Sequence, residues 1–140
     1  MRFKAKRSLS SDDLERLANV FRRYADIQAV YLFGSQATGK THSESDIDLA
    51  IVPRSPALRA QKLDILTDLV SAGFDEVSLV FLDTKDVALK FAAVRLNRVI
   101  YQTDDFDRGE TYSRILREYW DFRPYLRAQN DALKRRILNG

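Results

Sequence analysis

The spacing of hydrophobic residues predicts a small mixed sheet flanked by helices, which is an α/β (α+β) fold. Apolar runs typical of strands occupy residues 27–33, 46–52 and 77–82, and a shorter one occupies residues 98–102. Apolar positions three and four residues apart, typical of amphipathic helices, occupy residues 11–24, 57–72 and 86–96. We therefore expect helices to connect most of the strands, with the loop over 34–45 joining the first two as a hairpin.

Individual positions make this pattern more specific. The expected apolar face of the helix over 57–72 consists of Leu58, Leu63, Leu66, Leu69 and Val70. Gly73 is the expected C-cap of that helix. Apolar residues on both faces of the strand over 77–82 are typical of a covered, central strand. The expected buried positions of the helix over 86–96 are Val87, Phe91 and Val94.

A C-terminal helical segment is expected over about 104–138. Its first part has an apolar stripe at helical spacing, formed by Tyr112, Ile115, Leu116, Tyr119 and Trp120. This stripe packs onto the core or forms a partner interface, since tyrosine and tryptophan are enriched at such interfaces. Pro124 is expected to end or kink the helix, with a second helical piece over 125–138.

Composition limits the protein class. A chain of 140 residues, 45% hydrophobic and 31% charged, predicts one globular domain over 1–140 with its core at about 11–102. No apolar run approaches the ~20 residues of a membrane span, and no secretory signal is evident. With no cysteine present, a cytoplasmic protein is expected. The net charge of +3 is too small to predict direct nucleic-acid binding, and the oligomeric state stays open.

The candidate chemistry lies at the hairpin. Asp46 and Asp48 are two apart in a strand, so their carboxylates share a face and suit Mg²⁺ as oxygen ligands. At the end of the preceding strand, Gly34 permits a tight turn, and Ser35 offers a hydroxyl and backbone N–H groups to a phosphate. Lys40 is a further candidate for the phosphates because of its proximity, whereas the loop residue His42 is expected to be solvated.

The pattern from Gly34-Ser35 through Gly39 to Ser45-Asp46-Ile47-Asp48-Leu49 resembles the signature of the DNA polymerase β-like nucleotidyltransferase superfamily. The short chain is similar to its minimal (MNT) members, the antitoxins of HEPN/MNT toxin–antitoxin pairs. The resemblance implies that Asp46 and Asp48 bind two Mg²⁺ ions. It also implies that Gly34 and Ser35 bind the triphosphate of ATP, which is the substrate.

One position departs from the family pattern. The family has a third carboxylate on the next strand, where this chain has Ser78, which is neutral and a poor base. Glu76 lies two residues earlier on the same face and is a candidate replacement. Three cases follow: Glu76 substitutes, the partner supplies the group, or the enzyme is slow or inactive.

Three functions are therefore compared. The first is an antitoxin that transfers AMP from ATP to a tyrosine of a HEPN ribonuclease toxin. The second is a catalytically degenerate MNT domain that neutralises its toxin by binding alone. The third is a small-molecule nucleotidyltransferase of the aminoglycoside-modifying kind, for which the chain is short.

Overall fold

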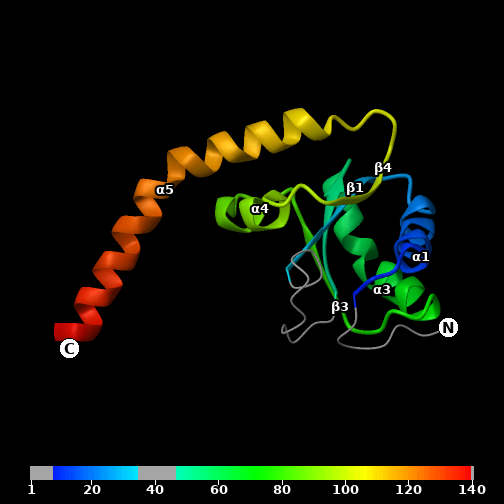
Figure 1. Cartoon of the computed structure of the whole chain (residues 1–140), viewed down its shortest axis with the longest axis horizontal. Coiled ribbons are helices and arrows are strands. Elements are labelled where there is room, and N and C mark those ends of the chain that lie inside the picture. The colour runs from blue at the N-terminus through cyan, green and yellow to red at the C-terminus, as the bar shows by residue number, and fades with distance from the viewer. Residues whose placement is uncertain (1–7, 35–46, 140) are drawn as a thin grey trace.

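The computed structural model describes residues 8–34 and 47–139, and within these ranges it confirms the α/β (α+β) class (Figure 1). In chain order its elements are α1 (Ser11–Arg22), β1 (Ile27–Phe33), β2 (Ile47–Pro53), the 3-10 helix η1 (Pro56–Gln61), α3 (Lys62–Ser71), β3 (Val77–Phe81), α4 (Val87–Val94), β4 (Val99–Gln102) and α5 (Arg108–Asn139). No described helix combines the length and hydropathy that a membrane span needs.

The strands form one mixed sheet in the order β3-β2-β1-β4. β1 is antiparallel to β2 and to β4, and β2 is parallel to β3. The short strand at the sheet edge is confirmed as β4. The prediction that the strand over 77–82 is central is wrong, because β3 is the other edge strand. Its two faces are still covered, since Leu79 and Phe81 pack into one core and Val80 contacts the other.

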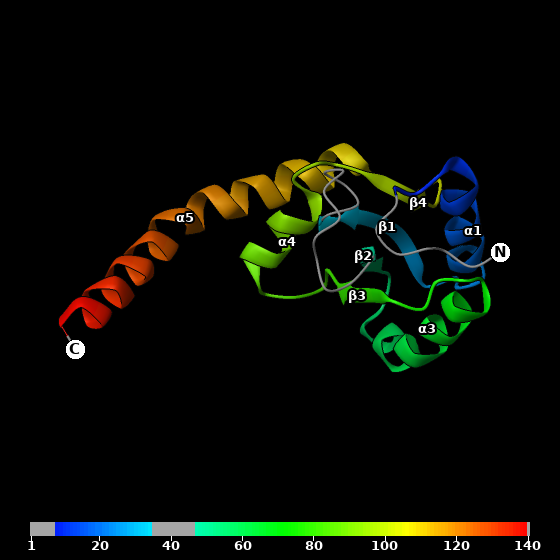
Figure 2. The same ribbon diagram turned by 60° about the horizontal axis from the view of Figure 1, so that its bottom comes forward.

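Each face of the sheet has its own core. On one face, strand residues such as Val30 and Leu49 pack under α1 and α3. On the other face, Tyr31 and Ala50 pack under α4 and the start of α5. Figure 2 shows α3 and α4 on opposite sides of the strands. Strand alternation therefore sends odd and even positions into two different helical layers.

The residues that face the core in the helix predicted over 57–72 differ from the expected ones. Its first part is the 3-10 helix η1, which has about three residues per turn, and only then does α3 begin. The tighter winding rotates the following residues, so that Leu63 is 74% exposed and Val70 is 53% exposed, whereas Ile65 is buried. Both were expected on the apolar face, and both expectations are wrong. The C-cap of α3 is Ala72 and not Gly73 as predicted, and Gly73 follows it with φ +103°.

The helices at the C-terminal end also depart from the predicted pattern. In α4, Val94 is buried as expected, but Ala93 is buried as well, and Val87 and Phe91 are only half-buried. α5 starts at Arg108 and continues through Pro124 to Asn139 without a break. Figure 1 shows that α5 changes direction partway along its length, which agrees with the expected kink.

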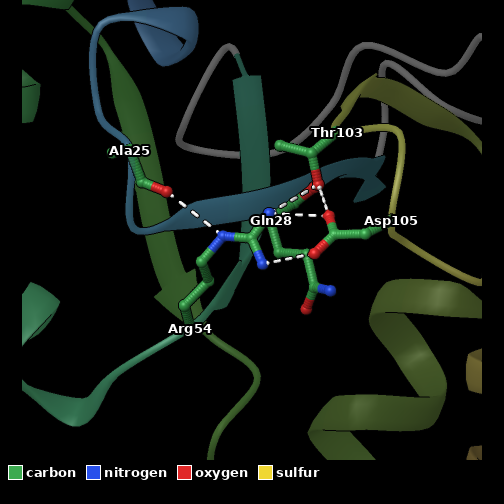
Figure 3. Close-up of polar contacts among 5 residues, drawn as sticks. All are labelled: Ala25, Gln28, Arg54, Thr103 and Asp105. Atoms are coloured by element: carbon green, nitrogen blue, oxygen red, sulfur yellow. Dashed lines mark hydrogen bonds and ion pairs between the residues drawn. The ribbon is translucent and has the colours of Figure 1, made fainter.

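A polar cluster fastens the start of the α5 segment to the sheet (Figure 3). Arg54, directly after β2, donates to both oxygens of Asp105 at 2.7 Å and to the Thr103 hydroxyl at 2.9 Å. Its Nε also donates to the Ala25 carbonyl at 3.2 Å. The guanidinium holds the pKa of Asp105 well below its usual range. Three segments distant in sequence are thereby held at one end of the sheet.

Replacing Tyr31 with phenylalanine should stabilise the protein. Tyr31 is fully buried, and its hydroxyl finds no hydrogen-bond partner among the residues that the structure describes. Removing a buried, unpartnered hydroxyl should raise the free energy of unfolding by about 1 kcal/mol. Urea unfolding measures the change, with Tyr101→Phe as a control at a half-buried position. A less stable Tyr31→Phe variant would contradict the absence of a partner.

Candidate active site

The turn after β1 brings the backbone of Gly34 against the side chain of Asp48. Phe33, the last residue of β1, pairs with Asp48 in the antiparallel register. Gly34 follows with φ +68°, in the left-handed region that favours glycine. A Cβ atom at Gly34 would lie 2.2 Å from Asp48 Oδ2. The turn therefore requires glycine at this position for two reasons: the backbone angle, and the lack of space for a Cβ atom beside the carboxylate.

Asp48 is a half-buried carboxylate without a basic partner among the residues described here. Burial raises its pKa above the usual value, and no cation among the described residues opposes this effect. A charged group in such a place is favoured by a bound cation, and carboxylate oxygens are the ligands that Mg²⁺ prefers. The donor chemistry of Asp48 therefore fits the divalent metal that its sequence pattern predicts.

Ser78 lies directly beside Asp48 in the sheet. The two residues are partners in the parallel register of β2 and β3, and both are half-buried on the same face. The residue that interrupts the family pattern is thus next to a predicted metal ligand. Glu76 is exposed just before β3, and its backbone carbonyl accepts a hydrogen bond from Ile47 N–H at 3.3 Å. That bond places the Glu76 backbone at the start of β2.

The remaining predicted site residues, Ser35, Lys40 and Asp46, lie outside the described residues. Within the described ranges, no group of three histidine, cysteine, aspartate or glutamate side chains could hold a metal. The structure thus brings Gly34, Asp48 and Ser78 together. The contact between Gly34 and the Asp48 carboxylate was missing from the sequence prediction, although the antiparallel pairing of the hairpin was its signal.

Comparison with models of protein families shows to which family this chain belongs. The model of the Polymerase beta, Nucleotidyltransferase family matches residues 15–106, a range that contains Gly34, Asp48 and Ser78. The chain belongs to this polymerase beta nucleotidyltransferase family. This confirms the resemblance seen at the hairpin motif. The matched range runs from within α1 to just past β4, and all of α5 lies beyond it.

Among similar proteins, this chain is 30% identical over 81 residues to the protein adenylyltransferase MntA of Shewanella oneidensis. The match spans 58% of this chain and 58% of MntA. A chain of a toxin–antitoxin complex with AMP-PNP has a TM-score of 0.69 at 23% identity, over 90% of this chain and 98% of that one. A chain of the complex of tri-AMPylated Shewanella oneidensis HEPN toxin with MNT antitoxin has a TM-score of 0.64 at 21% identity, over 89% of this chain and 95% of that one. These structures confirm the polymerase β-like fold.

Proposed function

We propose that this nucleotidyltransferase transfers AMP from ATP to a tyrosine of a HEPN ribonuclease toxin and thereby acts as its antitoxin. The observation that supports it in this chain is the Asp48 carboxylate, half-buried against Gly34 without a basic partner among the described residues. The similarity to MntA, a protein adenylyltransferase, supports the reaction class. The toxin–antitoxin complexes with similar folds, one with AMP-PNP and one with AMPylated toxin, support the substrate and the partner.

In this proposal Asp46 and Asp48 hold Mg²⁺, with two ions expected. The ions neutralise charge on the triphosphate and activate the attacking hydroxyl when they are bound. Gly34 lets the backbone approach the triphosphate, while Ser35 and Lys40 contact its oxygens. We place the reaction in the cytoplasm, where ATP and a ribonuclease toxin would both be present.

The transfer forms a bond between the tyrosine oxygen and the α-phosphorus of ATP. The bond from that phosphorus to the oxygen bridging it to the β-phosphate breaks, and pyrophosphate leaves. The tyrosine proton goes to a carboxylate, and we assign this role to Glu76. Its backbone position beside the start of β2 and its exposed side chain are compatible with a base that meets the acceptor at the surface.

Labelled ATP tests this function directly. The chain is incubated with α-labelled ATP, Mg²⁺ and the HEPN protein encoded beside its gene, and the toxin is then assayed for label and for ribonuclease activity. We expect label on a toxin tyrosine and loss of ribonuclease activity, both prevented by EDTA. An unlabelled toxin that remains an active ribonuclease would refute the proposal.

Ser78 supports a second candidate, in which the domain neutralises its toxin by binding alone. A site without its third carboxylate beside Asp48 could retain the fold and the interface after losing the chemistry. Under this alternative, Asp48→Ala should neutralise the toxin as well as the wild type does. Loss of neutralisation by a folded Asp48→Ala variant that still binds the toxin would exclude it.

Replacing Ser78 with aspartate should raise the rate of transfer at least about tenfold, because it adds a base and metal ligand next to Asp48. The same variant should have a lower melting temperature without Mg²⁺, since two half-buried carboxylates repel, and Mg²⁺ should restore it. Transfer assays and thermal unfolding with and without Mg²⁺ check both effects. Ser78→Ala is the control for loss of the hydroxyl. An unchanged rate in Ser78→Asp would show that the position does not limit catalysis.

A further inference from the structure

The last part of α5 leaves the body of the protein. Near the middle of α5, Tyr119 stacks on Phe91 of α4, with ring centroids 3.8 Å apart, and Glu118 forms an ion pair with Lys90 at 2.7 Å. Beyond them, Trp120 is 55% exposed and Tyr125 is 61% exposed. Figure 1 shows this part of the helix projecting away from the sheet. We call residues 120–139 the arm; twenty helical residues span roughly 30 Å.

One face of the arm combines aromatic, apolar and basic side chains. A shallow hollow is lined by Trp120, Arg123, Pro124, Arg127, Ala128 and Asp131. Their spacing of three and four residues places them along one side of the helix, which we call the arm face. The Arg123 guanidinium lies over the Trp120 ring, 5.0 Å from its centroid. This cation–π contact holds two large side chains in place before any partner arrives.

The arm also accounts for the net charge of the chain. It has five basic residues and two acidic ones, whereas the whole chain has 23 and 20, which leaves 18 of each sign in residues 1–119. The domain that bears the candidate active site is therefore formally neutral, and the net charge of +3 resides on the arm. A projecting helix with this charge favours an acidic partner surface.

We propose that the arm face docks on an acidic surface of the HEPN toxin and holds it for modification. This inference rests on the function proposed above and adds the surface that recognises the partner. Tryptophan and arginine are the residue types that most often dominate binding energy at protein interfaces. A helix of this length gains most of its stability from packing, and Figure 1 shows the arm projecting away from the body of the protein.

Two other occupants fit the arm face less well. A second copy of the chain would bring two arms of charge +3 together, and like charges across an interface oppose association. A nucleic acid would place its phosphates against Asp131, which lines the same hollow as the two arginines. An acidic protein surface pairs with the arginines and leaves Trp120 and Pro124 to apolar contacts.

Charge reversal on the arm tests the proposal. The full-length Arg123→Glu/Arg127→Glu variant is titrated with the purified HEPN protein encoded beside the gene, without ATP, in a calorimeter. Trp120→Ala is measured separately. Arg114→Glu/Arg117→Glu is the matched control, because it makes the same charge change at exposed positions earlier in α5. We expect the Kd to rise about 30-fold or more in both arm variants and to change less than about threefold in the control.

The outcomes separate this inference from the proposed function. If the wild type transfers AMP and the arm variants bind the toxin as tightly as the wild type does, the docking proposal is overturned and the proposed function is not. A wild type that does not bind the toxin overturns both proposals. Loss of self-association or of RNA binding in the arm variants, with toxin affinity unchanged, assigns the arm to those partners and overturns the docking proposal.

Discussion

Replacing Asp48 with asparagine should abolish AMP transfer and at the same time stabilise the fold. The amide is a poor metal ligand, so we expect transfer to fall by about 10²–10³-fold or more. Burial raises the pKa of Asp48, which means that its charge opposes folding when no metal is bound. The neutral side chain removes that opposition. Label transfer measures the first effect, and the melting temperature without Mg²⁺ measures the second.

The matched control is Asp104→Asn, which neutralises an exposed carboxylate before α5 and should change neither property. Mg²⁺ should raise the melting temperature of the wild type and have a much smaller effect on Asp48→Asn. Full transfer activity in Asp48→Asn would show that Asp48 is not part of the active site. A lower melting temperature would show that the carboxylate has a stabilising partner in the folded protein.

Replacing Gly34 with alanine should damage both the turn and the site. The added Cβ would lie 2.2 Å from Asp48 Oδ2, so the carboxylate or the turn must move. A displacement of about 1 Å at a catalytic group can reduce the rate by about 10²-fold, and we expect a loss of this size. At φ +68°, alanine also costs about 1–2 kcal/mol of backbone strain. Transfer kinetics and urea unfolding measure the two effects.

Gly109 provides the control for this substitution. In the first turn of α5, a Cβ at Gly109 would meet, among the described residues, only Asp107 Oδ1, at an ordinary contact distance of 3.7 Å. Gly109→Ala should therefore retain activity and gain about 0.4–1 kcal/mol of stability, because alanine restricts the unfolded chain. Wild-type activity and stability in Gly34→Ala would refute the close approach of Gly34 to Asp48.

Local signals in the sequence were sufficient for the hairpin. The apolar run over 27–33 is observed with the same bounds as β1, and Asp48 is at the start of β2 as predicted. Gly34 was predicted at the turn because only glycine tolerates the required backbone angle. These features depend on neighbours close in sequence, so a single chain is enough to predict them.

Features that depend on distant segments were less predictable. The apolar residues on both faces of β3 indicate that both faces are covered. They do not indicate whether β3 has a neighbouring strand on one side or on both sides. In the same way, the residue opposite Asp48 in β3 is fixed by the register of a parallel pair whose strands are joined through η1 and α3. The sequence predicted that Ser78 departs from the family pattern, while its position directly beside Asp48 required the structure.

The residues of the aromatic stripe lie in different environments along α5. Ile115 is buried in the core under α5, and Tyr119 stacks on Phe91 at the margin of the domain. One residue later, Trp120 is mostly exposed. Helical spacing predicts which residues share a face, but it does not predict where along a long helix the supporting domain ends.

The strand order has a consequence for how this protein can evolve. Asp48 belongs to β2 and Gly34 directly follows β1, and these two central strands have a neighbouring strand on each side. α5 follows the edge strand β4, and its last part projects away from the sheet (Figure 1). Mutations there can accumulate without disturbing the sheet. Under the docking proposal, a lineage can therefore change the toxin that the arm recognises while it keeps the residues of the candidate active site.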